Sequence, residues 1–195
     1  QMSHFYDLTG GTASGMTDSK LPDGQAGAEK ALNHALVGNA GANMIYESAG
    51  MHASLLGFSL ESLVIDNDII GATQRTIKGI EVNDERLSFE TIKDVCLNGP
   101  GHFLGSDQTL QLMQTEYLYP GVGDRKSPNE WNEQGALDVA QRAMAKVEEI
   151  LGHNFPSHIA ESVDAEIRRR FPVKLDRAHM LPPADSAAAR RVGSR

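Results

Sequence analysis

The sequence predicts an α/β fold in which strand–helix units come first and helices alone follow. Strand-like runs alternate with helical ones over residues 1–87, which is typical of a parallel sheet. From Ser88 onward no further strand pattern occurs, so the second half is expected to be helical. The chain has 195 residues, of which 40% are hydrophobic, and this is enough for one globular domain.

Glycine, proline and capping residues divide the first part into short elements. Pro22 suits the first turn of a helix, where its missing backbone N–H costs nothing, and Gly38 or Gly41 can end that helix. The next apolar run lies between Gly41 and Gly50 and is typical of a buried strand. Three strands are expected in all, within 7–14, 42–48 and 62–66. Helical segments are expected at 1–6, 22–38, 52–58 and 67–80.

The second part is expected to hold four helices, at 88–98, 106–117, 128–151 and 160–170. The third of these has the clearest boundaries. Ser127 and Glu130 form a capping box around Pro128 at its start, and Gly152 can end it. Apolar side chains recur on one face of this helix, which indicates that it packs against other elements.

The charge of the chain excludes some classes of partner. Its formal net charge is −8, its sequence pI is about 5.3, and its short basic cluster at 168–170 is typical of a helix end. Nucleic acid is therefore not expected as a partner. No apolar run approaches the roughly 20 residues of a membrane span, and the single cysteine, Cys96, cannot form an intrachain disulfide. We expect a cytoplasmic protein that does not bind a membrane.

Common catalytic and metal-binding motifs do not occur in the sequence. It holds no Walker-type loop, no G-x-S-x-G elbow, no H-E-x-x-H and no C-x-x-C, and no metal site is expected. Gly10 and Gly11 could cradle a phosphate, which leaves a phosphate-binding barrel enzyme as one alternative.

Polar residues follow the predicted strands at the edge where ligands bind. In parallel α/β sheets this edge lies beyond the carboxyl ends of the strands, which selects the loops that start at Ser14, Glu47 and Asp66. A carboxylate beside a phenol can hold a quaternary ammonium group through charge and cation–π attraction. We therefore expect Glu47 and His52 to be the catalytic residues, with Tyr46 binding substrate. The alternative is that Glu47 pairs with a neighbouring cation.

Two further residues are candidates for substrate binding. Asp18 lies in the polar loop after the first strand, where it could bind a cation or brace the helix that follows. His102 stands in the glycine-flanked bend 99–105, where it could serve catalysis or dock the helical part. Lys20 could act as an amine catalyst only if it were desolvated.

Several motifs resemble those of one known family, in the same order along the chain. They are 16–20 (MTDSK), 63–67 (LVIDN), 79–85 (GIEVNDE), 99–105 (GPGHFLG), 117–120 (YLYP) and 156–159 (PSHI). These segments look like the C-terminal part of the trimethylamine methyltransferase family. The resemblance covers roughly residues 1–175.

The resemblance implies a (β/α)₈ TIM barrel and a methyl transfer. Members of the family move a methyl group from a methylated amine, such as trimethylamine or glycine betaine, to the Co(I) corrinoid of a separate carrier protein. The corrinoid (cobalamin) is then not bound directly by this chain but carried by its partner, and we also expect a homo-oligomer. Residues 1–87 would be the last β/α units of the barrel, 88–175 a C-terminal helical part and 176–195 a flexible tail.

The length of the chain also bears on this interpretation. A complete barrel takes about 250 residues, so a chain of 195 residues with a helical part is expected to be a C-terminal portion. Trimethylamine-specific members of the family contain pyrrolysine, which this sequence does not show, whereas relatives without pyrrolysine act on quaternary amines. The alternative hypothesis is a non-catalytic fragment or an assembly subunit of such an enzyme.

Overall fold

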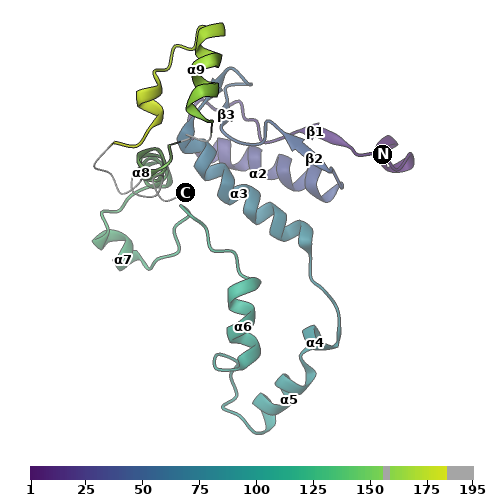
Figure 1. The fold of residues 1–195 in the computed structure, drawn as a ribbon. Coiled ribbons are helices and arrows are strands. Elements are labelled where there is room, and N and C mark those ends of the chain that lie inside the picture. The colour runs from purple at the N-terminus through teal and green to yellow at the C-terminus, as the bar shows by residue number, and fades with distance from the viewer. Residues whose placement is uncertain (156–158, 184–195) are drawn as a thin grey trace. The chain divides into compact units, whose positions relative to one another are not determined.

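The computed structural model describes residues 1–155 and 159–183, and Figure 1 shows their helices and strands. The chain divides into two compact units, Gln1–Ala143 and Met144–Arg195. The described residues form an α/β fold that is mostly helical, with four short strands in two sheets. This confirms the general α/β prediction, whereas these two small sheets do not by themselves close a barrel. Most of the expected tail at 176–195 and the motif residue His158 fall outside the described residues.

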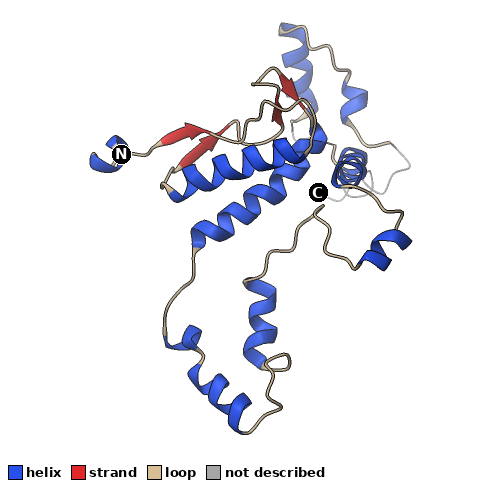
Figure 2. Ribbon diagram, turned by 180° about the vertical axis from the view of Figure 1, so that it is seen from behind, coloured by secondary structure: helices blue, strands red, loops and turns tan. Residues whose placement is uncertain are grey.

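The first unit opens with a parallel pair of strands joined by a long helix. The pair runs in register from Gly11 opposite Met44 to Ala13 opposite Tyr46. Figure 2 shows the two strands side by side along the helix that connects them. The first two predicted strands, the helix between them and their parallel pairing are thus confirmed. The elements are α1 (Met2–Phe5), β1 (Gly11–Ala13), α2 (Gly24–Asn39) and β2 (Met44–Tyr46).

The helix α2 packs against α3 (Leu60–Lys78) through a row that is largely polar. The buried residues of α2 recur every four positions: Ala26, Lys30, His34 and Gly38. Gly38 allows the two helices to approach closely, because a Cβ at this position would lie 2.4 Å from the Ile77 side chain. Leu32 and Leu36, whose spacing predicts this helix, are instead 61% and 62% exposed. Burial in this helix therefore follows the polar row and not the leucines.

The segment between β2 and the middle of α3 folds differently from the prediction. The helix expected at 52–58 is wrong, because β3 (Met51–His52) and β4 (Gly57–Phe58) form an antiparallel hairpin. The strand expected at 62–66 is also wrong, because these residues lie in the first turns of α3, which Ser59 caps by accepting a hydrogen bond from the backbone at 3.0 Å. Periodicity cannot distinguish a strand from a helix in so short an apolar run. Asp66 therefore lies inside a helix and not at a strand end.

Three helices follow α3 after a linker. The acidic residue Glu116 connects this part of the chain to α3 through ion pairs. The carboxylate of Glu116 lies 2.9 Å from Arg75 and 3.2 Å from Lys78, both on α3. It also lies 3.1 Å from Arg86. The hydrogen bond from Lys78 and the charges of the three cations hold the pKa of Glu116 below its ordinary value of 4.5. The helices are α4 (Asp84–Leu87), α5 (Phe89–Leu97) and α6 (Asp107–Thr115), and the last two confirm predictions.

Acid is expected to loosen this attachment. A carboxyl group whose pKa is lowered by folding stabilises the protein above its unfolded pKa and loses that contribution as the pH falls through the folded value. We expect Glu116→Gln to be less stable than the wild type at about pH 7, and the difference to vanish by about pH 3. Urea denaturation at both pH values measures this. Glu90→Gln is the control, because Glu90 pairs with exposed Lys93 at 3.5 Å and should matter little at either pH. An equal loss from Glu116→Gln at both pH values would contradict the assignment.

Asp68, an acidic residue of α3, fixes the loop that follows α6. The carboxylate of Asp68 accepts hydrogen bonds from the backbone N–H groups of Gly121, Val122 and Gly123 at 2.8, 2.9 and 2.9 Å. Val122 is 5% exposed. These three hydrogen bonds to the Asp68 carboxylate thus order a loop that is not part of a helix or strand.

The single helix expected at 128–151 is two helices, α7 (Pro128–Glu133) and α8 (Val139–His153). The predicted capping box of Ser127 and Glu130 is confirmed. Gly135 and Ala136 then adopt positive φ values of 92° and 52°, which interrupt the helix. The expected end at residue 151 is two residues early, because α8 includes Gly152 and ends at His153.

The second unit contains the helix α9 (Glu161–Arg170) and the 3₁₀ turn η1 (Arg177–Met180). Asp164 is 7% exposed and pairs with Arg168 at 2.8 Å and with Arg177 at 3.1 Å. The hydrogen bond from Arg168 is the main cause that lowers the pKa of Asp164. The basic cluster at 168–170 lies in the last turn of α9, as predicted. Among the described residues, no helix is both long and apolar enough to cross a bilayer.

Candidate active site

Three of the predicted site residues lie at the carboxyl edge of the parallel strand pair. Ala13 ends β1 and Tyr46 ends β2, and because they pair with each other the two following loops leave the sheet at the same edge. Asp18 lies in the first loop and Glu47 begins the second. All three side chains are exposed, that of Tyr46 by 50%. We call Asp18, Tyr46 and Glu47 the strand-edge residues.

Glu47 has a strained backbone conformation. Its φ of 56° lies in the left-handed region, which costs a residue with a Cβ about 1–2 kcal/mol. Such a conformation persists only where its surroundings enforce it. The next residues are anchored, because Ser48 O accepts a hydrogen bond from His34 Nε2 at 2.9 Å and Gly50 N donates one to Asp66 Oδ2 at 2.7 Å.

His34 joins the ends of the two strands beneath this edge. It is 2% exposed, and Ser14 Oγ lies 3.3 Å from its Nδ1. Because Ser48 O can only accept, we assign the hydrogen to Nε2, so that Nδ1 accepts from the Ser14 hydroxyl. Gly15 passes close to the ring with a φ of 91°, and a Cβ there would lie 2.4 Å from Ser48 O. The sequence does not distinguish His34 from the other histidines, since its partners are backbone and serine oxygens.

A buried ion pair lies between α2 and α3. Lys30 Nζ and Asp66 Oδ2 are 2.6 Å apart, and the two side chains are 1% and 2% exposed. The same oxygen of Asp66 accepts the hydrogen bond from Gly50 N. Asp66 therefore links both helices to the turn that follows β2. Sequence reasoning missed Lys30, because a lysine in a helix usually faces solvent.

His52 lies beneath the surface of this edge. It is 4% exposed; its Nδ1 lies 3.1 Å from Ser19 O and its Nε2 lies 2.5 Å from Ser62 Oγ. Both ring nitrogens are thus engaged by the loop after β1 and by α3. The structure buries His52 between the loop after β1 and α3, where it joins these two segments, and its part in catalysis stays a prediction.

The tip of the β3–β4 hairpin rests on the loop that carries Asp18. Ala53 N donates to Ser19 O at 3.0 Å and Ser54 N donates to Thr17 O at 3.1 Å. The hydroxyl of Ser54 also donates to Asp18 Oδ1 at 2.5 Å. Ala53, Ser54 and the residue after them have positive φ values of 50°, 54° and 72°. These contacts hold a strained hairpin tip in place and orient the carboxylate of Asp18.

Glu29 on α2 supports the same loop and adds negative charge to it. Its Oε2 accepts hydrogen bonds from Thr17 Oγ1 at 2.6 Å and from Asp18 N at 3.0 Å. The hydrogen bond from Thr17 is the main cause that lowers the pKa of Glu29 below its ordinary value. Glu29 is therefore ionised at neutral pH, and this edge presents carboxylates that suit a cationic ligand.

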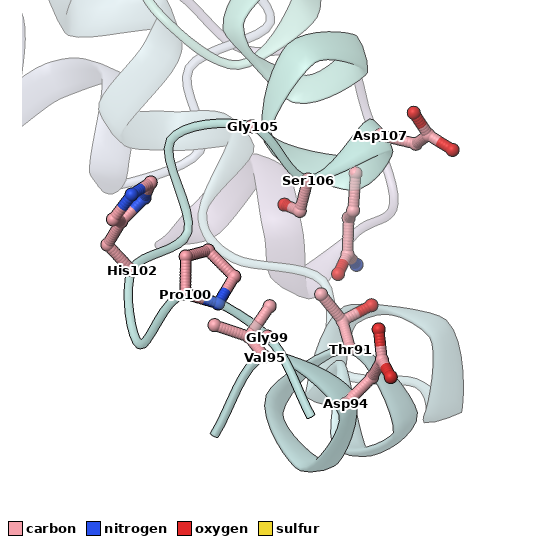
Figure 3. Close-up of a pocket in the computed structure, with 10 residues that line it drawn as sticks. Thr91, Asp94, Val95, Gly99, Pro100, His102, Gly105, Ser106 and Asp107 are labelled. Atoms are coloured by element: carbon pink, nitrogen blue, oxygen red, sulfur yellow. The ribbon is translucent and has the colours of Figure 1, made fainter. Parts of the chain in front are cut away.

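His102 lies apart from the strand-edge residues, in a separate hollow. Figure 3 shows this hollow, which has a volume of about 410 Å³ and lies between α5 and the start of α6. Its polar lining includes Thr91 and Asp94 from α5, Ser106 and Asp107 at the start of α6, and His102 from the glycine-rich bend. None of the strand-edge residues lines this hollow. The structure therefore does not bring His102 together with the other predicted residues.

Two further observations concern the binding of phosphate and of metal ions. Gly10 and Gly11 lie at the amino end of β1, and Gly10 N already donates to Asn43 Oδ1 at 2.9 Å. They lie at the opposite end of the strand from the edge where α/β proteins bind ligands. Within 1–155 and 159–183, no group of three or more His, Cys, Asp or Glu side chains is placed to hold a metal ion.

The fold and these residues define an α/β protein with an acidic, aromatic-bearing edge at the ends of two parallel strands. Comparison with known sequences identifies the family. The family model described as trimethylamine methyltransferase (MTTB) matches residues 1–175, and the chain belongs to this family.

Curated relatives support the assignment and show how much of them this chain represents. It is 37% identical over 181 residues to the trimethylamine methyltransferase MttB1 of Methanosarcina acetivorans, covering 91% of this chain and 34% of that protein. It is 38% identical over 167 residues to MttB of Methanosarcina thermophila, covering 86% of this chain and 33% of the relative. The glycine betaine methyltransferase of Desulfitobacterium hafniense strain Y51 is 28% identical over 169 residues, with coverages of 86% and 34%. The chain thus spans about one third of the length of these relatives.

Proposed function

We propose that this chain forms the C-terminal part of a methyltransferase that moves a methyl group from a methylated amine to the Co(I) corrinoid of a separate carrier protein. The membership of the family and the names of the relatives, which include trimethylamine and glycine betaine methyltransferases, support the methylated-amine substrate. The observation that carries the proposal is Glu47, an exposed carboxylate held in a strained conformation next to Tyr46 at the ends of parallel strands.

A methylated ammonium group suits these residues chemically. Its charge is spread over methyl groups, so it is bound by an aromatic face and a nearby carboxylate. Tyr46 supplies the aromatic face and Glu47 the carboxylate, with Asp18 adding charge from the neighbouring loop. A protonated tertiary amine could also donate its N–H to Glu47, whereas a quaternary amine offers no N–H. In this proposal His52 joins the loop after β1 to α3. His102 contributes to substrate binding from the separate bend at 99–105.

The transfer itself requires orientation more than acid–base chemistry. The C–N bond breaks with its electron pair left on nitrogen, and the methyl group joins a nucleophile on its opposite side. The corrinoid brought by the partner supplies that nucleophile and is a substrate of this chain, not a bound cofactor. The residues of this chain therefore hold the cation and leave one methyl group facing outward. The exposure of the strand-edge residues is compatible with that requirement.

We further propose that β1 and β2 are neighbouring strands of a (β/α)₈ barrel completed by other parts of the protein. Two parallel strands joined by a helix are the repeating unit of such a barrel. Met44 on β2 is 59% exposed, although parallel strands are ordinarily buried on both faces. The same exposed apolar surface favours a second candidate function, an assembly subunit without catalysis. Absence of turnover in the full protein supplied with its reduced carrier would favour this second candidate.

Substitution of the strand-edge residues tests the proposed function. In the full protein, Glu47→Gln is expected to lower kcat/KM for the methylated amine by about tenfold to a hundredfold, because a charged contact to the cation is lost. Tyr46→Leu should lower it as well, whereas Tyr46→Phe keeps the aromatic face and should retain most of the activity. Demethylation of the amine with the reduced carrier protein measures these effects.

A matched control separates a local effect from a general loss of charge. Glu133→Gln removes an exposed carboxylate at the end of α7 and should leave kcat/KM unchanged. Full activity in both Glu47→Gln and Tyr46→Leu would refute the assignment of this edge as the substrate site.

A further inference from the structure

Asp66 contacts the turn after β2 in addition to its ion-pair partner Lys30 on α2. The side chains of Lys30 and Asp66 are 1% and 2% exposed, and burying two charges is expensive compared with burying apolar groups of the same size. Besides pairing with Lys30, Asp66 Oδ2 accepts the backbone hydrogen bond of Gly50 at 2.7 Å. One oxygen of the carboxylate therefore contacts both Lys30 and the turn that begins with Glu47.

The geometry of Gly50 carries this contact to the turn. Its φ is 80°, and the ring of Phe58 lies so close that a Cβ at this position would come within 2.3 Å of it. Its carbonyl oxygen accepts a hydrogen bond from Ser59 N at 3.0 Å, at the start of α3. Gly50 is thus fixed through its N–H and its carbonyl by α3 and the N-cap of that helix, and through its packing by Phe58 of β4.

The other end of the same turn is fixed by Ser48, which is bonded to His34. Glu47 precedes these anchors and has a φ of 56°, a conformation that a glutamate does not hold without restraint. The conformation of the Glu47 backbone sets the direction in which its exposed side chain leaves the turn. A change at Asp66 would therefore reach the site through Gly50 and the turn.

We propose that Asp66, with Lys30 as its counter-ion, is a positioning residue that holds Glu47 in the conformation needed to bind the methylated amine. This inference rests on the proposed function for the role of Glu47. Asp66 acts through the hydrogen bond that it accepts from Gly50, and the ion pair with Lys30 orients its carboxylate.

The test compares two double variants that both lack the buried charges. In Lys30→Met/Asp66→Asn, the amide oxygen can still accept the hydrogen bond from Gly50. In Lys30→Met/Asp66→Leu, the side chain has the same branched skeleton but no acceptor. We expect the first variant to keep kcat/KM within about threefold of the wild type and the second to lose about tenfold or more, with both folded by circular dichroism. Equal activity of the two folded variants would overturn the proposal.

A second comparison shows whether the effect passes through Glu47. In a Glu47→Gln background, the difference between the two double variants should shrink to less than about threefold, because a misplaced residue cannot matter once its carboxylate is gone. A difference of undiminished size would show that Asp66 acts elsewhere. Asp68→Asn is the matched control, since Asp68 lies on the same helix and holds the loop 121–123 instead.

Hydrogen exchange keeps this test independent of the proposed function. The peptide that spans 45–52 should exchange faster in Lys30→Met/Asp66→Leu than in Lys30→Met/Asp66→Asn, and Asp68→Asn should leave it unchanged. If Glu47→Gln is fully active, the substrate role of Glu47 fails while this readout still reports on positioning. Equal exchange of the peptide in the two double variants would overturn the positioning role itself.

Discussion

Replacing Gly15 with alanine is expected to destabilise the protein by about 2–5 kcal/mol. The backbone φ of 91° is unfavourable for any residue with a Cβ, and the new methyl group would lie 2.4 Å from Ser48 O and 2.6 Å from the His34 ring. Both neighbours belong to the buried contact between the two strand ends, so neither can move without breaking the hydrogen bond between them. The free energy of unfolding from urea denaturation measures the effect.

Gly27→Ala is the control for this prediction. Gly27 lies within α2, and no atom lies within 4 Å of the position that its Cβ would take. Alanine is the better helix former, so this variant should be more stable than the wild type by about 0.5–1 kcal/mol. Equal stability of Gly15→Ala and the wild type would mean that the crossing of Gly15 over His34 is not tight in solution.

Removing one member of the buried ion pair is expected to have an effect of similar size. Asp66→Ala leaves the ammonium group of Lys30 buried without its counter-ion, which typically costs about 3–5 kcal/mol. The double variant Lys30→Met/Asp66→Leu should recover most of this loss, because apolar side chains can fill the space between the helices. Denaturant midpoints of the single and double variants measure the difference.

The outcome separates stability from positioning. A recovered double variant with low activity would show that the pair stabilises the fold less than it orders the turn after β2. If Asp66→Ala is as stable as the double variant, then Lys30 escapes to solvent and the pair is not tightly buried. Asp68→Ala should cost less, about 1–2 kcal/mol, since the carboxylate does not pair with a buried charge and the exposed N–H of Gly121 can be hydrated in its place.

The sequence predicts the regular elements of this chain well where local signals are strong. The strands around Ala13 and Tyr46 lie between glycines, and the capping box of Ser127 and Glu130 marks a helix start directly. Tyr46, Glu47 and Asp18 could be selected because strand ends of a parallel pair share an edge. The motifs in order along the chain were sufficient to identify the family, which the family model confirms over residues 1–175.

The errors arise where tertiary contacts decide between local alternatives. The run at 62–66 is apolar enough for a strand, but Ser59 provides a helix cap and the polar faces of Ser62 and Asp66 turn inward. The hairpin at 51–58 depends on positive φ values at Ala53, Ser54 and Leu55, which no local sequence preference predicts. Such residues are held by hydrogen bonds to another loop, and that loop is distant in sequence.

The supporting residues beneath the site were missed for a related reason. Lys30 and His34 occupy helix positions where polar side chains ordinarily face solvent, and the helical pattern of Leu32 and Leu36 suggests that the opposite face is buried. The pairing of Lys30 with Asp66, which are 36 residues apart, explains why the face with Lys30 is buried and the face with the leucines is exposed. Spacing within one helix cannot reveal a partner on another.

The polar row of α2 also determines how the site can fluctuate. His34 and Lys30 lie one helical turn apart, and each is bonded, directly or through Asp66, to the turn after β2. That turn cannot open unless the hydrogen bonds of Ser48 O to His34 and of Gly50 N to Asp66 both break. The exposed carboxyl edge should therefore open at a free energy that is set by these two contacts to buried side chains and not by its own exposure.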